Sequence, residues 1–140
     1  EEEKYADGRW RRIAMSEKHD EWLKQADYDM DTADAMFTSG RYLYAVFMCH
    51  LSIEKSLKGF YSKELAEVPP KTHNLLYLVK KIGKHPSQDL LKFITKLNTA
   101  SVATRYPDDL SRIQAAYTKE ITKEMIEESK GVLKWVKEQF

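Results

Sequence analysis

The sequence predicts an all-α protein, an up-and-down bundle of about five helices. Apolar residues recur every three and four positions over most of the 140 residues, which is the period of amphipathic helices. Glycine and proline are scarce, at 5 and 4 residues, so the chain has few turns and favours long helices over many short strands. No alternating segments indicate a pair of strands.

The composition is that of one globular domain. Hydrophobic residues make up 42% of the chain and charged residues 32%, which excludes disordered and fibrous classes. The net charge of +1 gives no strong field, so it does not indicate a dedicated nucleic-acid binder. With one cysteine, Cys49, and no signal peptide, we expect a reducing cytoplasm. The longest apolar run, about residues 42–49, is far shorter than the ~20 residues that cross a bilayer, so we expect no membrane partner.

Residues 1–15 have no clean period and are interpreted as an N-terminal arm, a remnant of cloning, or sequence upstream of a start at Met15. The helical domain is expected over residues 16–140. Its first helix begins after Ser16, an N-cap residue, and ends at Gly40. One face carries Leu23, Ala26, Met30, Ala33 and Phe37, and the other carries Asp20, Asp27, Asp31 and Asp34. We favour a solvated acidic face over a site for a hard cation, because no histidine or glutamate joins these aspartates at helical spacing.

The second helix is expected over about residues 41–63, and its first half is apolar almost all round. Such a helix lies in the middle of a bundle or at a dimer face. Its main stripe consists of Tyr42, Val46, Cys49, Ile53, Leu57 and Phe60. His50, Glu54 and Lys58 follow at four-residue steps on one side, and the order of Glu54 and Lys58 favours an ion pair. The apolar neighbours of His50 favour a satisfied interior histidine over a catalytic one.

Two prolines in the segment AEVPPKTHN end the second helix and stiffen the crossing to the third. Thr72 or Asn74 can cap that short helix, which turns Leu75, Leu78, Val79 and Ile82 inward. A fourth helix carries Leu90, Leu91, Ile94 and Leu97 and ends near Ala103. The segment TRYPDDL then breaks the pattern, and SRIQAAY after it is loosely patterned. The last helix begins near Thr118 or Thr122 and uses Ile121, Met125, Ser129, Val132 and Val136 on one face.

Three stretches, in this order, resemble the HEPN domain family: SGRYLYAVFMCHLSIEKSLKGFY from residue 39, KTHNLLYLV from residue 71 and ATRYPD from residue 103. That family shows an aromatic-rich second helix with an E-K-x-L-K segment, a K-T-H-x-L start to the third helix and an R-Y-P loop. The resemblance covers about residues 17–140. It implies a helical bundle that forms homodimers, an association with nucleotides or RNA, and a small nucleotidyltransferase partner in toxin–antitoxin-like pairs. We expect no cofactor and no metal.

The catalytic members of that family are ribonucleases with an arginine followed, after four to six residues, by a histidine. Arg105 matches the arginine, but the positions that follow it at this spacing are Leu110, Ser111 and Arg112. The ribonuclease motif is therefore not present at the expected spacing in this loop. We assign no catalytic residue, and enzyme activity stays an open question.

The candidate ligand-binding residues are Arg105, Tyr106, Lys71, Thr72, His73, Lys55 and Lys58. The Arg105 guanidinium could hold a phosphate while Tyr106 stacks on a base; the alternative is that this loop only closes the gap between helices. The start of the third helix could bind a phosphate, with Lys71, Thr72 and His73 beside it. Alternatively, His73 only makes a hydrogen bond there. Lys55 and Lys58 would form a positive cleft if they lie near Arg105.

The sequence thus predicts a HEPN-like domain that binds a nucleotide, an RNA-like polyanion or a nucleotidyltransferase partner, without an intact nuclease motif. Two alternatives remain open. One is a metal-independent ribonuclease that combines Arg105 with His73 or His50. The other is a purely structural dimerisation or interaction module that docks through its apolar second helix.

Overall fold

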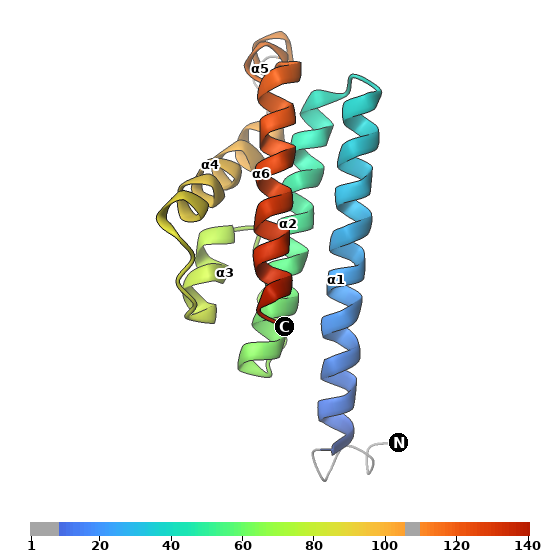
Figure 1. Ribbon diagram of the computed structural model, residues 1–140, viewed down its shortest axis with the longest axis vertical. Helices are drawn as coiled ribbons and strands as arrows, with labels where there is room; N and C mark the ends of the chain where they lie inside the picture. Colours follow the sequence, from blue (N-terminus) through green and yellow to red (C-terminus); the bar gives the residue numbers. More distant parts are fainter. Residues whose placement is uncertain (1–8, 106–109) are drawn as a thin grey trace.

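The computed structural model describes residues 9–105 and 110–140, and these residues form an all-helical bundle without a strand. The helices are α1 (Arg9–Thr38), α2 (Tyr42–Leu65), α3 (Leu75–Ile82), α4 (Gln88–Arg105), α5 (Leu110–Ala116) and α6 (Lys119–Glu138). The long helices α1, α2 and α6 run side by side, and α3 and α4 pack against α2 (Figure 1). The predicted all-α bundle is confirmed.

The helices α1 and α2 form an antiparallel hairpin around the turn at Gly40 (Figure 1). Gly40 has φ 76°, a left-handed conformation that costs glycine little, and this ends α1 as predicted. Small residues let the two helices approach closely. The Ser52 hydroxyl donates a hydrogen bond of 2.7 Å to the Ala26 carbonyl oxygen, and a Cβ at Gly59 would lie only 2.9 Å from the Trp22 Cβ.

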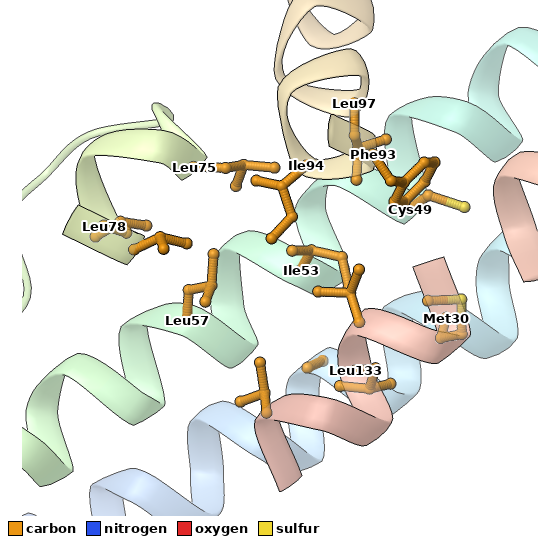
Figure 2. Close-up of a cluster of buried hydrophobic side chains, with 14 of the residues drawn as sticks. Met30, Cys49, Ile53, Leu57, Leu75, Leu78, Phe93, Ile94, Leu97 and Leu133 are labelled. Atoms are coloured by element: carbon orange, nitrogen blue, oxygen red, sulfur yellow. The ribbon is translucent and has the colours of Figure 1, made fainter. Parts of the chain in front are cut away.

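The core lies around α2, which packs against α1, α3, α4 and α6. Apart from the half-buried Tyr42, its apolar stripe is buried within the bundle, as expected for a helix in the middle of a bundle. Figure 2 shows Ile53 and Leu57 of α2 between Leu75 and Leu78 of α3 on one side and Leu133 of α6 on the other. Burial of these side chains provides the main stabilisation of the bundle.

Several helix boundaries differ from the prediction. The helix α1 begins at Arg9, before Ser16, and the loosely patterned segment after residue 109 forms the short helix α5, which makes six helices in the described ranges. The helix α4 continues to Arg105, so this arginine ends a helix instead of lying in a loop. Tyr106 lies outside the described residues. Two predicted core residues, Leu91 and Ile121, are exposed, because Phe93 and Thr122 are the positions that turn inward.

The helix α6 begins at the predicted cap residue Thr118, whose hydroxyl accepts a hydrogen bond of 3.3 Å from the Ile121 N–H. Among the described residues, no helix combines the length and the apolar character that a membrane crossing requires.

Candidate ligand site around Glu54

The carboxylate of Glu54 lies in the middle of α2 and is 4% exposed. Its Oε2 atom accepts a hydrogen bond of 3.0 Å from Lys58 Nζ, which confirms the predicted ion pair. Its Oε1 atom lies 2.9 Å from Nδ1 of His73, which comes from the segment between α2 and α3. A buried carboxylate needs such partners to offset the cost of its desolvation. Glu54 therefore links α2 to the segment between α2 and α3.

His73 is anchored at one ring nitrogen, yet its side chain is 65% exposed. Because an ionised carboxylate only accepts hydrogen bonds, Glu54 places a proton on Nδ1 of this imidazole. Nε2 is then left for solvent or a ligand. An exposed ring held in one orientation by a buried carboxylate is well suited to recognise a hydrogen-bonding ligand.

The start of α3 is fixed by side chains just after His73. The amide oxygen of Asn74 accepts a hydrogen bond of 3.1 Å from the Tyr77 N–H, and the amide oxygen of Asn98 in α4 accepts one of 2.9 Å from the Leu75 N–H. These bonds satisfy N–H groups that the helix itself leaves without a partner. They also occupy two of the N–H groups that a phosphate at this helix start would use. We therefore assign ligand contacts in this region to side chains.

His50 precedes Glu54 by one helical turn and is fully buried. Its Nδ1 atom lies 3.8 Å from Glu54 Oε1, and neither ring nitrogen makes a hydrogen bond with the described residues. Burial lowers the pKa of His50 to about 4; the charge of Arg105 acts in the same direction, while Glu54 and the nearby His73 backbone oppose the shift. The expectation of an interior histidine is thus met, but within the described part of the chain its ring lacks the expected hydrogen bonds.

Arg105 reaches this region from the end of α4. Its guanidinium carbon lies 5.3 Å from the centroid of the Phe47 ring, within the range of a cation–π contact. Phe47 lies one turn before His50 on α2, and the Arg105 charge contributes to the low pKa of His50. The fold therefore brings Arg105, His50, Glu54 and His73 into one neighbourhood.

The lysines predicted to form a positive cleft lie differently. Lys55 Nζ pairs with Asp29 of α1 at 2.8 Å, while Lys58 pairs with Glu54 of its own helix. Lys71 is exposed in the segment before α3, and the Thr72 hydroxyl accepts a hydrogen bond of 3.1 Å from the Asn74 N–H. Lys58 and Lys71 share one pocket, whereas Lys55 belongs to the contact between α1 and α2.

The acidic face of α1 pairs with α6 at two positions. Lys130 Nζ lies 2.9 Å from Asp34, and Lys137 Nζ lies 2.5 Å from Asp27. No group of three histidine, cysteine, aspartate or glutamate side chains that could hold a metal ion occurs in the described part of the chain. These aspartates therefore connect helices at the surface.

The family model of the HEPN domain matches residues 19–139 of the chain. This chain belongs to the HEPN domain family. The predicted family is confirmed over nearly the whole of the described bundle.

Two solved structures share the fold of this HEPN domain. TT1696 from Thermus thermophilus is 25% identical and superposes with a TM-score of 0.77 over 88% of this chain and 98% of that chain. ST0689, an archaeal HEPN homologue, is 28% identical with a TM-score of 0.70 over 86% of this chain and 96% of that chain. The curated proteins contain no match. The relatives thus establish the family and the fold of the chain.

One arginine–histidine pair of this HEPN domain does have six intervening residues, Arg12 and His19 in α1. The His19 ring packs edge-on against Phe140, with 6.4 Å between the ring centroids. Its Nε2 atom is buried without a hydrogen-bond partner among the described residues. This histidine therefore belongs to the contact between α1 and the end of the chain.

A pocket lies next to the Glu54–Lys58 pair and was not predicted from the sequence. It has a volume of about 220 Å³ and lies between α1, α2 and the segment that follows α2. Its lining residues are Lys18, Trp22, Lys58, Ser62, Val68, Pro69, Pro70 and Lys71. Lys18 and Trp22 are one turn apart on α1, which is a local signal, but their approach to the two prolines depends on how the segment crosses the bundle.

Proposed function

We propose that this HEPN domain binds the phosphate groups of a nucleotide or of RNA beside His73 and Arg105. The observation that carries this proposal is the hydrogen bond of 2.9 Å between Glu54 and His73, which holds an exposed imidazole in one orientation. A protonated or hydrogen-bonding imidazole and a guanidinium are both good phosphate contacts. The nearby ring of Phe47 positions the Arg105 guanidinium.

The charge of the whole chain fits a local contact better than a broad electrostatic surface. With a formal net charge of +1, the domain does not attract polyanions over its entire surface. Binding should therefore involve few phosphates and depend weakly on salt, since each phosphate contact adds about one unit to the salt slope. A nucleotide or a short RNA segment meets this condition.

The partner proposal follows from the family resemblance. We infer that the domain acts as a homodimer and associates with a small nucleotidyltransferase in a toxin–antitoxin-like pair. The lack of a histidine at the family spacing after Arg105 supports a binding role with little or no catalysis. Co-expression with a nucleotidyltransferase encoded beside it, followed by size-exclusion chromatography, tests this part of the proposal.

The binding proposal is tested by titrating ATP, GTP and a labelled single-stranded RNA at low salt. His73→Ala and Arg105→Ala should each weaken binding by about tenfold, the usual effect of losing a charge-assisted phosphate contact. Lys134→Ala removes an exposed positive charge from α6 and serves as the matched control. The absence of binding at millimolar ligand would rule out the proposed function.

A second candidate function is metal-independent cleavage of RNA. The observation that favours it is again the Glu54–His73 contact, because a carboxylate-oriented imidazole can act as a general base. His50 is poorly suited to this role at neutral pH, since its pKa is about 4 and it is buried. Cleavage that persists in EDTA and disappears in both His73→Ala and Arg105→Ala supports this function; equal activity in either variant contradicts it.

A further inference from the structure

The pocket next to Glu54 combines a flat apolar wall with positive charge at its edge. Trp22 of α1 and two prolines of the segment after α2, Pro69 and Pro70, provide apolar surfaces, and Val68 adds to them. Trp22 is half-buried, so part of its indole remains accessible to a ligand. Aromatic side chains of this kind stack on the faces of nucleobases whatever the base.

Three lysines line the same pocket. Lys18 and Lys71 are exposed and line the pocket from opposite segments, α1 and the residues before α3. Lys58 lines it as well, although its ammonium group is already paired with Glu54 at 3.0 Å. Among the described residues, no carboxylate lines the pocket. A ligand that fits this arrangement has a flat apolar part, which packs on the wall, and an anionic group, which reaches the lysines.

The volume limits what can enter. The pocket measures about 220 Å³. That is smaller than the roughly 300–1,000 Å³ of pockets that bury most of a drug-sized ligand. A single base can therefore be enclosed, while its ribose and phosphates remain at the rim, where the two exposed lysines lie.

We propose that this pocket binds the base of one nucleotide against Trp22, with Lys18 and Lys71 as a second phosphate contact besides the one at His73 and Arg105. The proposal rests on the proposed function and adds to it the contact with the base. The pocket and His73 lie on two sides of the same carboxylate, because Lys58 pairs with one Glu54 oxygen and His73 with the other. A free nucleotide and the terminal nucleotide of an RNA offer the same chemistry to this site.

Calorimetric titration of the full chain with AMP, ribose 5-phosphate and a short RNA tests the assignment. AMP should bind about tenfold more tightly than ribose 5-phosphate, the usual contribution of one stacked base. Trp22→Ala should remove that difference, and Lys71→Glu, at an exposed position, should weaken both ligands. Tyr28→Ala, an exposed aromatic of the same helix, and Lys134→Ala should leave binding unchanged.

The outcomes separate this assignment from the function on which it rests. If Trp22→Ala and Lys71→Glu bind AMP as the wild type does while His73→Ala does not, the pocket assignment is wrong and the phosphate site stands. If the wild type binds none of the three ligands, the proposed function fails and the assignment with it. Trp22→Phe, which keeps an aromatic ring at this position, should show intermediate affinity for AMP; affinity equal to that of Trp22→Ala contradicts stacking.

Discussion

Glu54 Oε1 lies 2.9 Å from His73 Nδ1 and joins the middle of α2 to the segment that leads into α3. The two residues are far apart in the sequence, and one is buried while the other is exposed. The same carboxylate pairs with Lys58. Glu54 therefore sets both the structure of the buried polar cluster and the orientation of the candidate ligand contact.

Replacing Glu54 by glutamine should destabilise the fold by about 3 kcal/mol, because it leaves the buried Lys58 ammonium without its counter-charge. Urea denaturation at neutral pH measures the loss. The double variant Glu54→Gln/Lys58→Met should regain part of it. Asp34→Asn, which removes an exposed pair with Lys130, is the control and should cost less than about 1 kcal/mol. Equal losses in the two single variants would contradict a buried ion pair.

The stability of the protein should fall on acidification below pH 6.5, and His50 should cause part of this fall. Burial lowers the pKa of His50 from 6.5 to about 4. Between these values the unfolded chain binds a proton that the folded chain does not, so unfolding becomes easier as the pH falls. The full effect amounts to about 3 kcal/mol.

The free energy of unfolding at pH 7 and pH 4.5 tests this statement. His50→Gln should show a smaller decrease between the two pH values than the wild type, whatever its stability at pH 7. His85→Gln, in the exposed loop after α3, should keep the wild-type decrease. An unchanged decrease in His50→Gln would show that His50 titrates normally in the folded state.

Gly59→Ala should weaken the contact between α1 and α2. The added Cβ would lie 2.9 Å from the Trp22 Cβ, so the two helices must move apart. Such overpacking costs about 1–3 kcal/mol, more than the helix propensity that alanine adds. Gly131→Ala in α6 is the matched control, since nothing lies within 4 Å of its added Cβ, and it should stabilise the fold by about 0.5–1 kcal/mol. A stabilised Gly59→Ala variant would contradict the close approach.

Asn98→Ala should loosen the segment that carries His73. The substitution removes the hydrogen bond of 2.9 Å to the Leu75 N–H at the start of α3. This loss should lower the free energy of unfolding by about 1 kcal/mol. Hydrogen exchange at Leu75 should become faster, and affinity for the ligand should fall with it. Thr95→Ala, which removes a hydrogen bond to the Leu91 carbonyl oxygen of the same helix, is the control on α4. Unchanged exchange at Leu75 would show that Asn98 does not hold this segment.

The parts of the fold that depend on neighbours along the chain could be predicted from the sequence. The stripes of α2 and α3 and the Glu54–Lys58 pair follow from the helical period, which is local. The inward positions of α4 were partly missed, because Leu91 and Phe93 are both apolar and the period alone does not choose between them. The short α5 was missed because its single buried residue, Ile113, gives no recognisable stripe.

The candidate site depends on contacts between distant segments, and these could not be predicted. The sequence motifs indicated His73 and Arg105 as separate candidates. The contact between His73 and Glu54 could not be predicted, because it depends on the path of the segment between α2 and α3. Because α4 extends to Arg105, the guanidinium of this arginine lies at the Phe47 ring. Trp22 was not a candidate from the sequence, since the pocket beside it forms where the segment with Pro69 and Pro70 packs near α1.

The most direct test of a phosphate contact at His73 is the NMR spectrum of the histidine side chains during a titration with short RNA and with AMP. Assignment by His73→Gln and His85→Gln distinguishes the exposed rings. We predict that the His73 ring signals shift and reach saturation as ligand is added, while those of His85 stay in place. Unchanged His73 signals at saturating ligand, or equal shifts at His73 and His85, would contradict a specific phosphate contact beside Glu54.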